Sequence, residues 1–262
     1  MSRKILVAGN WKMHGDADMV KTLLGGIKAG VADDAPYEVA VCPPDVFLSQ
    51  AQAMISDSPV RLGGQTVSEH PHGGAHTGET SAEMLLSMGC ELVLVGHSER
   101  RTDNAETDAD VAHKFARAQA AGLLPVLCIG ETLEERKAGS TMAVVKRQIE
   151  AVIEVVGIKG FEQSVIAYEP VWAIGTGLTA SPEEAQEVHQ FIRSQLAEKN
   201  DTIARRIQIL YGGSCKGSNA NALFSMPDID GGLIGGAALT STDFLAICEQ
   251  AAIVSAQTPA GE

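Results

Sequence analysis

Several polar side chains stand directly after short apolar runs, in positions where they could take part in proton transfer. Asn10 and Lys12 follow the first run. His97 follows the fourth run and Glu169 follows the sixth. A carboxylate can abstract a proton, an imidazole can polarise a carbonyl group, and an ammonium group can stabilise the negative charge that develops. If the fold brings these residues together, the sequence predicts proton transfer on a small anionic substrate.

Each of these residues also has a simpler interpretation. Glu169 could be a solvated carboxylate, His97 a structural histidine and Lys12 a surface charge. Glu169, however, precedes an apolar loop, 170–174, that ends in Gly175-Thr-Gly177. Exposed apolar residues usually need a surface to close on, so we predict a lid that excludes water. His97 lies where a strand gives way to a predicted helix, whose positive end favours the neutral imidazole.

Two glycine-rich turns follow the last two apolar runs. Gly212-Gly213-Ser214 comes after the seventh run and Gly235-Gly236 comes after the eighth. A single glycine pair usually marks only a tight turn. In parallel barrels, however, phosphate often binds at this place through backbone amides and a short helix N-terminus. The pair of turns therefore predicts a phosphate site, to which Ser214 would add a hydroxyl donor.

The positions of these residues depend on eight apolar runs that alternate with longer amphipathic segments. Most of the runs are continuously apolar, as is typical of parallel strands that are covered on both faces. The runs are residues 5–8, 39–42, 60–62, 92–95, 124–129, 165–168, 207–210 and 233–234.

Hydroxyl residues with a glutamate three positions later predict helix starts at Thr80, Thr132 and Ser181. In this pattern the hydroxyl and the carboxylate satisfy backbone amides at the helix start reciprocally. Pro182 strengthens the third prediction because proline favours the first helical position. After it, apolar residues repeat at three- and four-residue steps and predict one buried face, at Ala185, Val188, Phe191, Ile192 and Leu196.

Eight strands with helices between them, and no break in composition, favour an α/β fold with a single (β/α)8 barrel. We expect the barrel to span residues 1–256 and residues 257–262 to form a flexible tail. An open doubly wound sheet is the competing fold, but it normally has a Gly-x-Gly-x-x-Gly turn, which Gly9-Asn-Trp-Lys12 is not. In a parallel barrel the C-terminal strand ends share one rim, where active sites lie.

Composition narrows the classes of function. The 262 residues include 20 Lys and Arg against 33 Asp and Glu, a formal charge of −13. Nucleic-acid binding rests largely on excess positive charge, so we expect no nucleic-acid partner. No apolar run approaches the roughly 20 residues that cross a membrane. The sequence thus predicts an acidic, soluble protein without a membrane partner.

The cysteines and a histidine-rich segment give no metal prediction. The five cysteines are scattered and never form Cys-x-x-Cys, which indicates free thiols in a reducing cytoplasm. Cys215, beside a glycine turn, is the one expected to be accessible. His70, His72 and His76 lie close together, but they lack rigid helical spacing, so we expect a solvent or subunit-contact loop and no metal site.

Taken together, five motifs resemble the triosephosphate isomerase family over almost the whole chain, from about residue 5 to residue 251. They are Asn10-Trp-Lys-Met13, Gly96-His-Ser-Glu-Arg-Arg101, Cys128-Ile-Gly-Glu131, Tyr168-Glu-Pro-Val-Trp-Ala-Ile-Gly-Thr-Gly177 and Tyr211-Gly-Gly-Ser214. The resemblance implies a TIM barrel, usually as a homodimer. It also implies interconversion of dihydroxyacetone phosphate and D-glyceraldehyde 3-phosphate in glycolysis and gluconeogenesis, through an enediolate and without metal or organic cofactor.

The resemblance also implies roles for individual residues. It implies that Glu169 is the catalytic base, that His97 is the electrophile and that Lys12, with Asn10 beside it, binds the substrate. Glu99 would be a supporting carboxylate near the lysine. Phosphate contacts are implied for Gly175, Ser214, Gly235 and Gly236.

The sequence departs from the family pattern at a few positions. His14 stands where asparagine is common, Thr66 where asparagine is usual and Cys215 where valine is common. The loop 68–76 is unusual, whereas Thr77-Gly-Glu79, a subunit-contact motif in the family, is intact. These departures concern details of the subunit interface more than the chemistry.

Two other functions fit the same residues. A Schiff-base aldolase would use Lys12 as its nucleophile, and borohydride would then trap the substrate on that lysine. A non-enzymatic phosphosugar-binding protein would keep the pocket without turnover, but the presence of Glu169, His97 and Lys12 argues against it.

Overall fold

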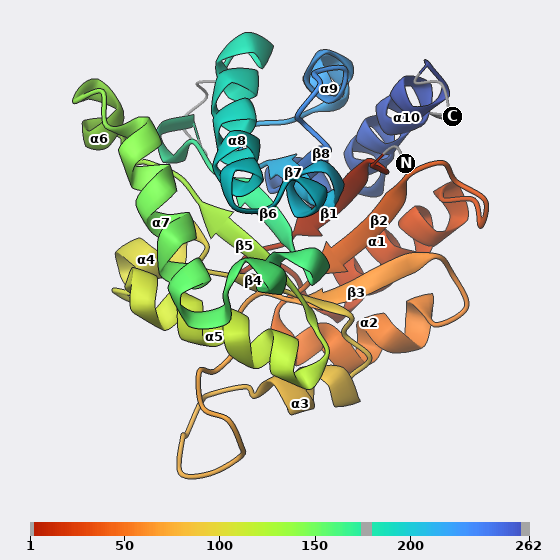
Figure 1. Ribbon diagram of the computed structural model, residues 1–262. Helices are drawn as coiled ribbons and strands as arrows, with labels where there is room; N and C mark the ends of the chain where they lie inside the picture. Colours follow the sequence, from red (N-terminus) through yellow and green to blue (C-terminus); the bar gives the residue numbers. More distant parts are fainter. Residues whose placement is uncertain (1–2, 174–179, 258–262) are drawn as a thin grey trace.

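The structure, a computed structural model, describes residues 3–173 and 180–257. Within this part of the chain, eight parallel strands form a closed barrel in which each strand pairs with its neighbours in sequence and β8 pairs with β1 (Figure 1). The (β/α)8 barrel predicted from the sequence is confirmed. The strands are β1 (Leu6–Asn10), β2 (Glu38–Cys42), β3 (Val60–Gly64), β4 (Leu92–Val95), β5 (Leu124–Ile129), β6 (Val165–Tyr168), β7 (Gln208–Tyr211) and β8 (Gly231–Ile234).

Helices surround the barrel on its outside (Figure 1). The α-helices are α1 (Ala17–Gly30), α2 (Leu48–Ile55), α3 (Ala82–Ser87), α4 (Ser98–Asp103), α5 (Asp108–Ala121), α6 (Leu133–Lys137), α7 (Thr141–Val156), α8 (Pro182–Arg206), α9 (Gly217–Phe224) and α10 (Ser241–Gln257). Short 3-10 helices are η1 (Asp45–Phe47), η2 (Ile158–Gln163), η3 (Val171–Ala173) and η4 (Gly236–Leu239). None of the helices in the described ranges combines the length and apolarity needed to cross a membrane.

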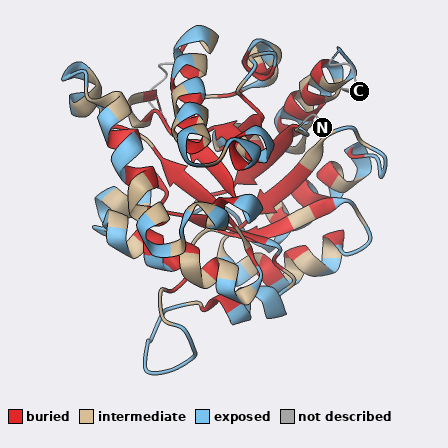
Figure 2. Cartoon of the chain, viewed as in Figure 1, coloured by how far each residue is buried: buried red, intermediate tan, exposed pale blue. Residues whose placement is uncertain are grey.

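Buried residues form two layers because successive side chains of a strand point to opposite sides. One cluster fills the barrel and includes Leu6, Ala8 and Leu94, whereas Val7 and Val93 belong to the larger cluster between strands and helices. Figure 2 shows that the strands are buried almost throughout, while the helices carry exposed residues. Burial on both faces explains why the strands are continuously apolar in the sequence.

Two of the three predicted helix starts are confirmed and one is shifted. Thr132 and Ser181 cap α6 and α8 with the reciprocal hydrogen bonds that the sequence pattern predicts. The prediction at Thr80 is wrong by one residue: Ser81 caps α3, and its hydroxyl accepts the backbone N–H of Met84 at 3.3 Å. The Thr80 hydroxyl instead donates to Asp45 at 2.7 Å, which ties this loop to η1. Adjacent hydroxyl residues left the cap position ambiguous.

The strand and helix ends differ slightly from the predicted ones. β1 extends to Asn10 and β3 to Gly64, each two residues beyond the apolar run. Gln257 is the last residue of α10, and the rest of the predicted tail, 258–262, lies outside the described residues.

Candidate active site

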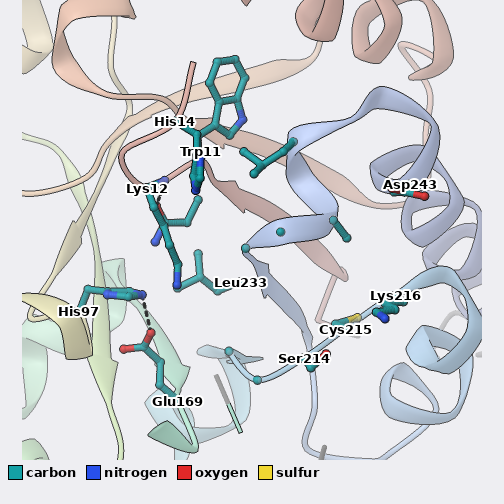
Figure 3. A pocket seen from close by; sticks show the side chains of 17 residues that line it. Trp11, Lys12, His14, His97, Glu169, Ser214, Cys215, Lys216, Leu233 and Asp243 are labelled. Carbon is teal, nitrogen blue, oxygen red and sulfur yellow. Dashed lines mark hydrogen bonds and ion pairs between the residues drawn. The ribbon is translucent and has the colours of Figure 1, made fainter. Parts of the chain in front are cut away.

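The C-terminal strand ends meet at one cavity of about 590 Å³ (Figure 3). Asn10 ends β1, Lys12 follows it, His97 lies two residues after β4, and Glu169 directly follows β6. The same cavity is lined by both predicted glycine turns. Its lining residues are Asn10, Trp11, Lys12, His14, His97, Glu169, Gly212, Gly213, Ser214, Cys215, Lys216, Leu233, Gly235, Gly236, Ala237, Leu239 and Asp243. Most of the residues singled out in the sequence are therefore brought together.

Glu169 and His97 contact each other directly inside this cavity. One carboxylate oxygen of Glu169 lies 2.7 Å from Nε2 of His97, and the other accepts the backbone N–H of Ser98 at 3.1 Å. The two side chains are only 2% and 7% exposed. A base and a hydrogen-bond donor thus sit side by side, shielded from bulk water, where a small substrate can reach both.

The position of His97 fixes which of its ring nitrogens carries a proton. His97 is the N-cap of α4, and its Nδ1 accepts the backbone N–H of Glu99 at 3.2 Å. An acceptor nitrogen carries no proton in the neutral ring, so Nε2–H is the donor that points at Glu169. The hydrogen bond at Nδ1 and the positive end of α4 both oppose a second proton on the ring.

Opposing influences act on the pKa of His97. Burial lowers the pKa, whereas the charge of the Glu169 carboxylate and its hydrogen bond to the ring raise it. With the two side chains in contact, the net direction is upward. A substrate that separates them would remove the main upward influence and leave burial and the Nδ1 hydrogen bond, both of which favour the neutral ring.

Lys12 is held in an unusual backbone conformation beside the carboxylate of Glu99. Its φ of 52° lies in the left-handed region, which is strained for a lysine. The Lys12 N–H donates to the side chain of Asn10 at 3.0 Å, and the amide of Gln65 donates to the Lys12 carbonyl at 2.8 Å. Its ammonium group donates to Glu99 at 2.6 Å. Glu99 does not line the cavity, but it fixes the direction of the lysine.

The two glycine turns bring backbone donors to the same cavity, where Gly235 lies beside the side chain of Lys12 and Gly212 beside that of Glu169. The backbone N–H groups of Ser214, Gly235 and Gly236 donate to no described residue. Gly236 also begins η4. Backbone N–H groups without a described partner at a helix N-terminus can bind an anion, so the phosphate site stays a prediction for these residues. Gly175, the fourth predicted phosphate contact, lies outside the described residues, as does the second half of the predicted lid, 174–177.

The start of the predicted lid is anchored by a buried carboxylate. Glu131 is fully buried and accepts hydrogen bonds from the Tyr168 hydroxyl at 3.0 Å and from the indole of Trp172 at 3.0 Å. The guanidinium group of Arg136 lies 4.1 Å from the centroid of the Trp172 ring. These contacts position the backbone on both sides of Glu169. Glu131 stands in a quoted sequence motif, but nothing in the sequence indicated this role, and the same holds for Gln65.

Two further sequence predictions concern Cys215 and the histidine-rich loop. Cys215 lines the cavity but is only 5% exposed, and burial raises the pKa of its thiol to about 12, so the expectation of an accessible cysteine is wrong. In the histidine-rich loop, the rings of His70 and His76 stack with centroids 3.5 Å apart. No group of three or more His, Cys, Asp or Glu residues in the described ranges is arranged to hold a metal ion.

Comparison with known proteins agrees with this geometry. The family model described as triosephosphate isomerase matches residues 5–251. A relative named triosephosphate isomerase from Dechloromonas aromatica (strain RCB) is 58% identical over 249 residues, which is 95% of this chain and 99% of the relative. A relative of the same name from Hydrogenovibrio crunogenus (strain DSM 25203 / XCL-2) is 53% identical over 95% of this chain and 98% of its own length. With a match of this extent, the chain belongs to the triosephosphate isomerase family of enzymes.

Proposed function

We propose that the protein interconverts dihydroxyacetone phosphate and D-glyceraldehyde 3-phosphate through an enediolate intermediate, as a step of glycolysis and gluconeogenesis. The observation that carries this proposal is the 2.7 Å contact between Glu169 and His97, in a cavity that also holds Lys12 and two turns with amides that donate to no described residue. Membership of the family supports the same reaction.

Glu169 is the base and His97 the electrophile in this mechanism. A carbon acid beside a carbonyl is very weak, so a carboxylate can remove its proton only if the developing negative charge is stabilised. Glu169 takes the proton from one carbon and returns it to the neighbouring carbon. His97 donates from Nε2 to the substrate oxygen. Because this N–H contacts Glu169 in the free enzyme, the substrate oxygen replaces the carboxylate there and frees it to act as base.

Lys12 supplies fixed positive charge near the reacting oxygen. Its hydrogen bond to Glu99 and the contacts of its backbone to Asn10 and Gln65 hold the ammonium group in place before the substrate arrives. A charge that is already oriented needs no reorganisation during the reaction, which makes its stabilisation of the enediolate effective.

The phosphate group of the substrate binds at Ser214, Gly235 and Gly236, together with Gly175. This end of the cavity is remote from the carbon atoms that react, so phosphate binding can supply free energy for closure of the lid, 170–177. Closure excludes water and holds the phosphate away from the geometry in which it would leave the enediolate. No metal or organic cofactor takes part in these steps.

We also propose that the protein is a cytoplasmic homodimer. Met13 is 94% exposed and Val46 is 79% exposed. The loop between β3 and α3 protrudes from the barrel (Figure 1). Hydrogen bonds from Gln65 to Lys12 and from Thr80 to Asp45 link this loop to the segments that carry the two apolar residues. Apolar surface of this kind favours burial against a second copy.

A coupled isomerase assay in the presence of a chelator tests the function, with the molar mass measured by light scattering. We expect turnover of D-glyceraldehyde 3-phosphate that the chelator does not change, exchange of solvent deuterium into the carbon next to the carbonyl group, and the mass of a dimer. Absence of turnover would contradict the proposed reaction. Trapping of substrate on Lys12 by borohydride would instead favour the aldolase.

A further inference from the structure

A second lysine lines the cavity, just after the glycine turn at residues 212–214. Lys216 follows Ser214 and Cys215 on the segment between β7 and α9, and it is the N-cap residue of α9. Figure 3 places it on the opposite side of the cavity from His97 and Glu169. It therefore lies at the anion-binding end and away from the reacting groups.

The two lysines of the cavity differ in their carboxylate partners. The charge of Lys12 is partly offset by Glu99, with which it forms an ion pair at 2.6 Å. Lys216, by contrast, forms no ion pair with any residue in the described ranges 3–173 and 180–257. An exposed ammonium group without a carboxylate partner retains its full attraction for an anion.

Asp243 is the carboxylate that could weaken this attraction. It also lines the cavity, but it accepts a hydrogen bond from the hydroxyl of Thr240 at 2.9 Å, and its backbone N–H donates to the same hydroxyl at 3.2 Å. This reciprocal pair caps the start of α10 and engages one oxygen of the carboxylate. Lys216 is therefore a cavity-lining cation that no described carboxylate pairs with, two positions after Ser214 in the chain.

We propose that Lys216 is a further phosphate-binding residue, whose ammonium group attracts and holds the phosphate dianion of the substrate. The inference rests on the proposed function, since it concerns the same substrate. A phosphate monoester carries close to two negative charges at neutral pH. Backbone amides fix the orientation of the oxygens, whereas the lysine adds long-range attraction in a protein whose net charge of −13 otherwise repels anions.

Lys216 is expected to act on substrate binding and not on the chemical step. It lies far from the carbon atoms that exchange a proton, so it stabilises the bound substrate and the transition state to the same extent. An interaction of this type lowers KM and leaves kcat nearly unchanged. Because the group is exposed, salt should screen the effect strongly.

The test compares Lys216→Gln, Lys216→Arg and a matched control, Lys146→Gln, in which the lost charge lies on α7 outside the cavity. We expect Lys216→Gln to raise KM for D-glyceraldehyde 3-phosphate, and the dissociation constant of inorganic phosphate measured by calorimetry, by about 2- to 5-fold at low ionic strength. Its kcat should stay within about 2-fold of wild type. Lys216→Arg, which keeps the charge, should remain close to wild type.

Ionic strength provides the decisive contrast. At about 1 M salt, where the screening length falls to about 3 Å, the difference between wild type and Lys216→Gln should disappear. Equal phosphate affinity in these two proteins at low salt would overturn the inference, as would an equal effect of Lys146→Gln or a loss confined to kcat. Calorimetry measures phosphate binding without turnover. If the wild type were inactive, the proposed reaction would be contradicted, while the role of Lys216 in phosphate binding would still be tested.

Discussion

The contact between Glu169 and His97 links the ionisation of two groups that the proposed mechanism uses as a charged carboxylate and a neutral imidazole. Burial lowers the pKa of His97, and the charge and hydrogen bond of Glu169 raise it above its ordinary value. Glu169→Gln keeps the size of the side chain and removes the charge. We therefore expect the pKa of His97 to fall in this variant, because burial and the Glu99 N–H at Nδ1 then dominate.

Nitrogen-15 NMR titration of the histidine rings measures this change. The spectra should also show a proton on Nε2 and none on Nδ1 in the neutral ring of both proteins. An unchanged or higher pKa in Glu169→Gln would mean that the carboxylate does not control the ionisation of His97.

At the scale of residues, the sequence reveals side chains whose position follows from a strand end. Glu169, His97 and Lys12 could be predicted because each stands within four residues after an apolar run, in a fold whose strand ends share a rim. Gln65 and Glu131 could not, because their roles consist of hydrogen bonds to residues 53 and 41 positions away, respectively, which no local pattern encodes.

At the scale of elements, the ends of β5 and β6 must approach closely to place Glu169. A Cβ atom on Gly130 would lie 1.8 Å from the backbone oxygen of Glu169, so only glycine fits without moving one of the two segments. Gly130→Ala should displace the carboxylate of Glu169, the proposed base, and lower kcat by about 100-fold, the size of effect that a displacement near 1 Å can cause.

Gly25→Ala is the matched control for this prediction. Gly25 lies within α1, and no atom lies within 4 Å of a Cβ added there. Alanine favours the helix by about 0.5–1 kcal/mol relative to glycine, so this variant should keep full activity and unfold at slightly higher temperature. Full activity of Gly130→Ala in the same assay would show that the approach of the two strands does not position Glu169.

Element starts and ends were predicted less well than the elements themselves. Hydroxyl residues stand at both 80 and 81, and the sequence pattern alone could not decide between them. The tertiary hydrogen bond from Thr80 to Asp45 leaves Ser81 as the cap. The last two residues of β3 are glycines, which lack the apolar side chains by which strands are recognised in a sequence. The predicted strand therefore ended two residues too early.

At the scale of the whole molecule, a buried ionic network around Asp230 connects the N-terminal segment, α8 and β7 at the start of the final strand. Asp230, directly before β8, is hydrogen-bonded to Arg3 and to Arg193 at 2.6 Å each, and it accepts the backbone N–H of Ile209 in β7 at 2.9 Å. Burial raises the pKa of Asp230, and the two arginines oppose this shift. The network joins segments more than 200 residues apart, so sequence patterns could not predict it.

Arg193→Met should destabilise the protein strongly. The substitution keeps much of the apolar stem but leaves the charge of Asp230 with Arg3 as its remaining cationic partner, and loss of one partner of a buried ion pair costs about 3–5 kcal/mol. Arg205→Met removes an exposed pair with Asp201 and should change the free energy of unfolding by less than about 0.5 kcal/mol. Urea unfolding at a fixed protein concentration measures the free energy of unfolding of both variants and of the wild type.

The destabilisation by Arg193→Met should depend on pH. Without the arginine, the pKa of Asp230 rises further, so the folded state binds a proton more readily than the unfolded state does. Stability then falls as the pH rises from the ordinary carboxyl value, near 4, through the raised value. We expect a smaller difference from wild type near pH 4 than near pH 8. A difference that is constant or larger in acid would contradict this account of Asp230.

The measurement that tests the central claim most directly is the kcat of Glu169→Asp, determined together with its KM. The shorter side chain retracts the carboxylate by one methylene group, so it keeps the charge but loses the position from which it can reach the substrate carbon. Our account predicts that kcat falls by at least about 100-fold while KM changes little, because the interaction that is lost is made in the transition state. Turnover equal to that of the wild type would remove Glu169 from the role of base.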